Sequence, residues 1–97
     1  MTQEEKLKQK AELDPNWQLT HNQTRLERKF KFKNFKKPLE LVQVIAQIAE
    51  EQKHHPEISF GWGHLTIEIW THTISNLTQG DFQLALKIDE AYEQTNA

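Results

Sequence analysis

The sequence contains no cysteine and no long run of apolar residues. The absence of cysteine excludes a disulfide framework, a thiolate metal site and a thiol nucleophile. No apolar stretch approaches the roughly 20 residues that a membrane-spanning helix needs. The polar beginning of the chain, Met1 to Lys6, does not resemble a secretory signal. We therefore expect a soluble, cytoplasmic protein without a membrane partner.

An excess of positive charge is also missing, because 12 Lys and Arg residues face 14 Asp and Glu residues, which gives a net charge of −2. A general nucleic-acid-binding role has no electrostatic support from this balance, and we expect no nucleic acid partner. The 97 residues, 36% hydrophobic and 27% charged, fit one globular domain over residues 1–97. A chain this short buries one modest core, so association with further copies would help it.

Two kinds of hydrophobic periodicity are present. Apolar residues recur every second position in the segment 25–32, which predicts a strand with one buried side. Spacings of three and four in the segment 39–53 predict an amphipathic helix. Extended to the whole chain, the patterns predict helices over residues 2–13, 39–53 and from 78 onward, and strands over 17–20, 25–32, 58–62 and 64–72. This order predicts an α+β fold of two layers, with a four-stranded, antiparallel sheet and three helices on one face.

Histidines gather in the second half of the chain. The run His54-His55-Pro56 directly follows the predicted central helix, and His72 and Asp81 come within one strand and turn of it. Histidine is the only side chain whose ordinary pKa lies between pH 5 and 8. The group therefore indicates either proton-transfer chemistry or metal binding.

Two acids accompany the histidines. Glu50 precedes His54 by four residues, so the two side chains share a face if the helix continues that far, and the carboxylate would then hold the imidazole. The alternative is a solvated helix end. Asp81 follows Thr78 by three residues, a spacing typical of an acid that caps a helix N-terminus.

A zinc ion would take His54, His55 and His72, with Asp81 as a possible fourth ligand. Adjacent side chains diverge in an extended chain, however, which argues against a shared ion for the histidine pair. Our hypothesis is a site with no metal and no cofactor, and the metal site stays as an alternative.

A longer spaced pattern links these residues to a known family. Its elements are Glu50, the run His54-His55-Pro56, Trp62, His72 and Asp81, with five, nine and eight residues in the last three gaps. This pattern resembles the signature of the pterin-4a-carbinolamine dehydratase family. Trp17, the segment 30–35 and the segment 77–81 resemble further family features, and the likeness covers roughly residues 12–92.

The resemblance implies an enzyme that dehydrates 4a-hydroxytetrahydropterin to the quinonoid dihydropterin during pterin cofactor recycling. It implies assembly as a homodimer or homotetramer, active-site histidines at His54, His55 and His72, and supporting acids at Glu50 and Asp81. We expect His54 and His72 to share the acid and base roles on opposite sides of the pterin. His55 would then bind the ring and Glu50 would orient His54.

Trp62 and Trp17 are candidates to line the pterin pocket, since a flat heterocycle packs well on an aromatic face, although both could also belong to the core. His64 and Trp70 lie outside the family pattern and could alter the shape of the pocket. The alternative function is a non-catalytic binding or assembly module on the same fold.

Overall fold

The computed structural model describes residues 1–96. Its elements, in chain order, are α1 (Gln3–Lys10), β1 (Gln18–Thr20), β2 (Arg25–Lys31), α2 (Lys36–Gln52), β3 (Glu57–Gly61), β4 (His64–Ile69) and α3 (Gln79–Asn96). This confirms the predicted order and the α+β class. Helix α1 ends three residues earlier than predicted, and α2 begins three residues earlier.

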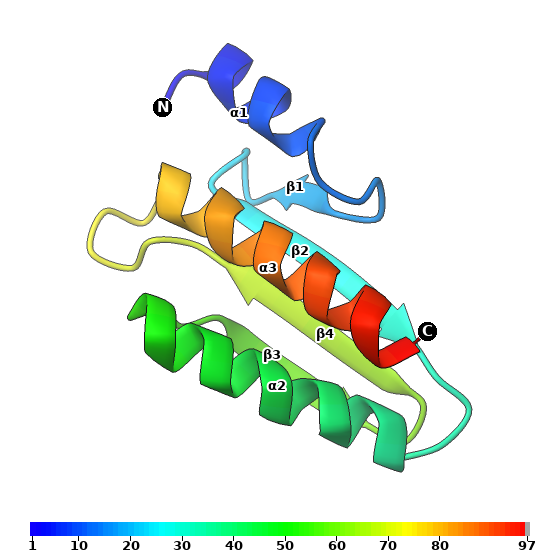
Figure 1. Cartoon of the computed structure of the whole chain (residues 1–97). Helices are drawn as coiled ribbons and strands as arrows, with labels where there is room; N and C mark the ends of the chain where they lie inside the picture. Colours follow the sequence, from blue (N-terminus) through cyan, green and yellow to red (C-terminus); the bar gives the residue numbers. More distant parts are fainter. Residues whose placement is uncertain (97) are drawn as a thin grey trace.

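The four strands form one antiparallel sheet in the order β1-β2-β4-β3. Helices α2 and α3 lie side by side across one face of it (Figure 1). The predicted alternation is confirmed: Leu26 and Phe30 of β2 and Leu65, Ile67 and Ile69 of β4 are at most 3% exposed. These side chains belong to the apolar core whose burial holds the two layers together.

One buried polar cluster crosses between the layers. Trp17 has no exposed surface, and its indole Nε1 donates a hydrogen bond of 2.7 Å to Asp89 of α3. Arg28 of β2 is 4% exposed and donates to the same carboxylate. A buried carboxylate is tolerated only when it is paired and hydrogen-bonded, and both conditions are met here.

Helix α1 is fastened to the rest of the fold by a buried lysine. Thr2 and Glu5 form a capping box at the N-terminus of this helix. Lys6, 6% exposed, donates from Nζ to the Gln23 carbonyl oxygen and to Asn76 Oδ1, each at 2.8 Å. Because Asn76 lies in the loop between β4 and α3, α1 helps to fix the path of that loop.

The turn between β3 and β4 is held against the loop that leads into α2. Gly63 has a φ of 77°, and its N–H donates to the Asn34 carbonyl at 2.9 Å while its own carbonyl accepts from the Phe32 N–H at 2.8 Å. A left-handed φ and the short approach to Phe32 both favour glycine here. Within the part of the chain described, none of the helices has the length and apolar character needed to cross a membrane.

Candidate functional site

A cleft lies between the segment that follows α2 and the segment that follows β4. Figure 1 shows that the end of α2, the loop after β4 and the start of α3 lie at the same end of the sheet. The volume of the cleft is about 200 Å³. Seven residues from two segments line it: Lys53, His54, His55, Trp70, Thr71, His72 and Thr73. The three histidines singled out in the sequence therefore face one common space, although His72 is 17 or more residues away from the other two along the chain.

The end of α2 decides where the histidine pair points. Lys53 adopts a left-handed conformation, with φ 54° and ψ 41°, and stops the helix. The His54 N–H then donates to the Ala49 carbonyl at 3.1 Å, which closes the last turn as glycine-type helix caps do. This reversal directs the following chain into the cleft, and Pro56 prevents the helix from continuing.

The imidazole of His54 is paired with Asp81, since Nε2 of the ring contacts Oδ1 of the carboxylate. Asp81 has no exposed surface. Its other oxygen accepts hydrogen bonds of 2.8 Å from the Thr71 hydroxyl and from the Thr78 N–H. Asp81 thus caps α3, as its spacing from Thr78 predicted, and it also orients His54.

The predicted pairing of Glu50 with His54 is wrong. The Glu50 carboxylate contacts Nε2 of His55 instead. The prediction assumed helical geometry through residue 54, but the left-handed Lys53 breaks that geometry and carries His54 away from Glu50. The Glu50–His55 pair is largely in solvent, with side chains 75% and 60% exposed.

His72 lies beyond the end of β4, in an exposed loop closed by a bridge between Thr71 and Asn76. Its ring packs on the ring of Trp70, with 4.4 Å between the centroids. Across residues 1–96 the ring of His72 makes no hydrogen bond, so this aromatic contact is what orients it.

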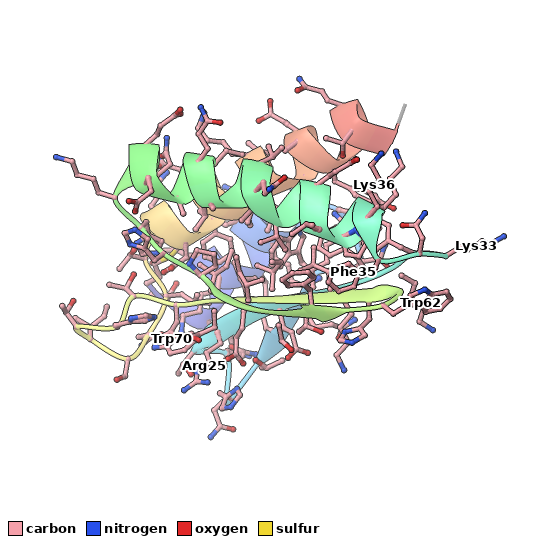
Figure 2. The ribbon with its side chains drawn as sticks, turned by 90° about the horizontal axis from the view of Figure 1, so that it is seen from below. Arg25, Lys33, Phe35, Lys36, Trp62 and Trp70 are labelled. Atoms are coloured by element: carbon pink, nitrogen blue, oxygen red, sulfur yellow. The ribbon has the colours of Figure 1, made fainter. Side chains whose placement is uncertain are left out.

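Neither of the two tryptophans expected at the pocket lies there. Trp17 is fully buried in the core, where its indole N–H donates a hydrogen bond to Asp89, so it cannot face a ligand. Trp62 is 70% exposed at the turn between β3 and β4, at the other end of the sheet from Trp70 (Figure 2). The expectation that Trp17 and Trp62 line the pocket is therefore wrong for the cleft of a single chain. The tryptophan that lines this cleft is Trp70.

Four lining residues were absent from the predicted site: Lys53, Trp70, Thr71 and Thr73. Of these, Thr71 carried a signal in the sequence. It occupies a position with inward parity in the β4 pattern, directly before His72, where a hydroxyl needs a polar partner. Asp81 is that partner, but the sequence gives no means of pairing them.

The arrangement suits proton transfer. A carboxylate only accepts hydrogen bonds, so Asp81 places the proton of neutral His54 on Nε2 and leaves Nδ1 as an acceptor for a ligand. The carboxylate also stabilises the imidazolium that forms when Nδ1 takes up a proton. Among residues 1–96, no group of three or more His, Cys, Asp or Glu side chains is arranged to hold a metal ion.

Comparison with known proteins gives a consistent picture. A sequence profile described as pterin 4 alpha carbinolamine dehydratase matches residues 1–91. A protein of Cupriavidus pinatubonensis named as a candidate pterin-4-alpha-carbinolamine dehydratase is 50% identical over 76 residues, which are 78% of this chain and 66% of that protein. A protein of Rubrobacter xylanophilus with the same type of name is 42% identical over 88% of this chain and 78% of its own length.

Two solved structures share the fold. A crystal structure described as a transcriptional coactivator/pterin dehydratase from Brucella melitensis has a TM-score of 0.88 and 27% identity, over 95% of this chain and 97% of that one. A pterin dehydratase-like protein described as a RuBisCO assembly factor in the alpha-carboxysome has a TM-score of 0.68 and 20% identity, over 79% of this chain and 89% of that one. The second likeness shows the fold alone. With its sequence matched over nearly the whole length, the chain belongs to the pterin 4 alpha carbinolamine dehydratase family.

Proposed function

We propose that the protein dehydrates 4a-hydroxytetrahydropterin to the quinonoid dihydropterin, in the recycling of a pterin cofactor. The observation that carries this proposal is the cleft that His54, His55 and His72 line together. Membership of the dehydratase family supports it, and so do the carboxylates behind two of the three imidazoles.

The reaction asks for little more than proton transfer. The substrate carries a hydroxyl group on the carbon next to a ring nitrogen, so the nitrogen lone pair can form a carbon–nitrogen double bond as the hydroxyl leaves. One group must protonate the departing oxygen, which leaves as water, and another must take the proton from the nitrogen. Each such transfer by a positioned side chain contributes typically about 10²–10⁴-fold to the rate.

The paired carboxylates suggest how the roles divide. Asp81 holds His54 with Nδ1 free and stabilises its cation, which suits His54 to accept the proton from nitrogen. His72, on the opposite segment of the cleft, would donate to the departing hydroxyl. His55, held at the rim by Glu50, would contact the ring of the substrate.

The test is a stopped-flow assay with synthetic 4a-hydroxytetrahydropterin. His54→Ala and His72→Ala should each lower turnover by at least about a hundredfold, the lower end of general acid–base effects, while circular dichroism shows a folded protein. His64→Ala is the matched control, because His64 begins β4 and does not line the cleft. Near-normal rates in either of the first two variants would refute the assignment.

The same assay separates the alternatives. A folded wild-type protein with no turnover would favour the non-catalytic binding or assembly role. Metal analysis of protein purified without a tag tests the metal hypothesis: a stoichiometric metal ion lost in His72→Ala would replace the proton-transfer account.

We also propose that the chain works as a homodimer or homotetramer. β3 forms one edge of the sheet, and an edge strand presents unpaired backbone groups that another copy can pair with. Sedimentation velocity measures the state directly, and a monomer at micromolar concentration would contradict this.

A further inference from the structure

His72 differs from the other two histidines of the cleft in how it is held. His54 and His55 each rest against a carboxylate, whereas the ring of His72 finds no polar partner within residues 1–96. The residue also begins an exposed loop, since residues 72–75 are all exposed. A side chain in such a position samples several staggered rotamers unless packing selects one of them.

The packing that selects a rotamer comes from Trp70. Its indole and the His72 ring pack in a tilted arrangement, with 4.4 Å between centroids and 44° between the ring planes. The guanidinium of Arg25 also packs on the indole, with its Cζ 3.9 Å from the ring centroid. Figure 2 shows Arg25 and Trp70 together at the end of the sheet that carries the cleft. His72 and Arg25 therefore both pack on the indole of Trp70.

Arg25 is itself fixed. Its Nη1 donates to Glu68 Oε1 at 3.1 Å, and the two side chains are 30% and 19% exposed. Glu68 lies in β4, and His21 approaches its other oxygen at 3.8 Å. The contacts therefore run from the rigid sheet through Arg25 and Trp70 to His72.

We propose that Trp70 and Arg25 are positioning residues for His72 in the dehydration reaction. This inference rests on the function proposed above. Trp70 holds the imidazole at the orientation in which it can reach the leaving hydroxyl, and the cation–π contact with Arg25 keeps the indole itself in place. Misplacement of a catalytic group by about 1 Å can lower a rate about a hundredfold, so an unanchored His72 would be a poor acid.

The residues lie outside the pattern that identifies the family. No part of the spaced signature includes position 70 or position 25. The proposal gives the indole a role in orientation rather than in binding the pterin.

The test uses two pairs of variants. Trp70→Thr removes the ring, and Trp70→Phe keeps a smaller one; Arg25→Met removes the cation, and Arg25→Lys keeps it. Lys29→Met is the control for Arg25→Met, because Lys29 is an exposed cation of the same strand. Each variant is first checked for folding by circular dichroism.

Two readouts are expected to move together. In the NMR spectrum of the wild-type protein, the ring current of Trp70 should shift the His72 ring protons upfield, and Trp70→Thr should abolish that shift. In the stopped-flow assay, kcat should fall at least about tenfold in Trp70→Thr, and less in Arg25→Met, as expected for a misaligned acid. KM should change by no more than about twofold, because an interaction that only orients the catalyst contributes little to ground-state binding.

Rescue by the conservative variants completes the test: Trp70→Phe and Arg25→Lys should recover most of kcat and part of the upfield shift. A rise in KM with unchanged kcat in Trp70→Thr would overturn the proposal in favour of substrate binding by Trp70. An unshifted His72 signal in the wild-type protein would also overturn it, because the two rings would then not be in contact. If the wild-type protein shows no dehydration, the proposed function fails, and the NMR comparison alone then supports or overturns the positioning of His72.

Discussion

The buried carboxylate of Asp81 offers the sharpest perturbation of the site. One of its oxygens contacts His54 Nε2, and the other accepts from the Thr71 hydroxyl and the Thr78 N–H. In Asp81→Asn the amide oxygen can still serve Thr71 and Thr78, but the NH₂ group then faces His54. The imidazole can accept from this group only by moving its own proton to Nδ1, so the nitrogen left for the cleft becomes a donor in place of an acceptor.

The expected effects on rate and stability differ in size. Loss of the acceptor nitrogen should lower kcat by about 10²–10⁴-fold, the range of general acid–base catalysis and of tautomer reversal in hydrolase triads. Stability should fall by only about 1 kcal/mol, because the helix cap and the threonine contacts remain. Asp81→Ala also removes those contacts, and unsatisfied buried groups together with a lost cap should cost about 3–5 kcal/mol.

The assays are urea unfolding for stability and stopped-flow dehydration for rate. Asp89→Asn is the matched control, since Asp89 is the other buried aspartate of α3 and serves Trp17 and Arg28 instead of a histidine. It should lose about 3 kcal/mol of stability through the weakened buried ion pair and keep the kcat of its folded fraction.

Two results would refute this reasoning. The first is Asp81→Asn with turnover above about a tenth of the wild-type rate, well outside the range expected when a catalytic base is lost. The second is an equal loss of kcat in folded Asp89→Asn, which would mean that any disturbance of α3 impairs the reaction.

The other predictions concern single features of the fold. Glu50→Gln should leave unfolding by urea within about 0.5 kcal/mol of wild type, because the Glu50–His55 pair is exposed; a larger loss would contradict that. Lys6→Met should lower stability by about 1–3 kcal/mol, since it removes buried hydrogen bonds, and an unchanged urea midpoint would mean that α1 is fastened by other contacts. Gly63→Ala should lower stability by about 1–3 kcal/mol because of its left-handed φ, whereas Gly80→Ala, in the first turn of α3, should not lower the thermal midpoint; equal effects of the two would contradict the strain argument.

Local patterns predicted the elements well. The alternation around Leu26 and Phe30 and the helical spacing of Leu41 and Ile45 reflect burial on one side of an element, and their side chains are at most 3% exposed. These predictions succeed because strand and helix periods follow from backbone geometry alone.

The expected partners of the site residues were less well predicted. Helical spacing predicts that Glu50 contacts His54. Because Lys53 is left-handed, Glu50 contacts His55 instead. A left-handed conformation at a lysine has no reliable sequence signal, because few residues other than glycine favour it. The failure thus arose from one backbone dihedral at the end of a helix.

The sequence by itself determined the periodic elements, the α+β order and the histidines and acids that mark the family. Each of these follows from the spacing of residues along the chain. Only the tertiary structure decided that Asp81, 27 residues from His54, holds that imidazole, and that Trp70 rather than Trp17 or Trp62 lies at the cleft. Such contacts depend on where the end of α2, the loop after β4 and the start of α3 meet once the sheet and helices have packed. The relative positions of these three segments depend on the packing of the whole core, which cannot be inferred from any single segment of the sequence.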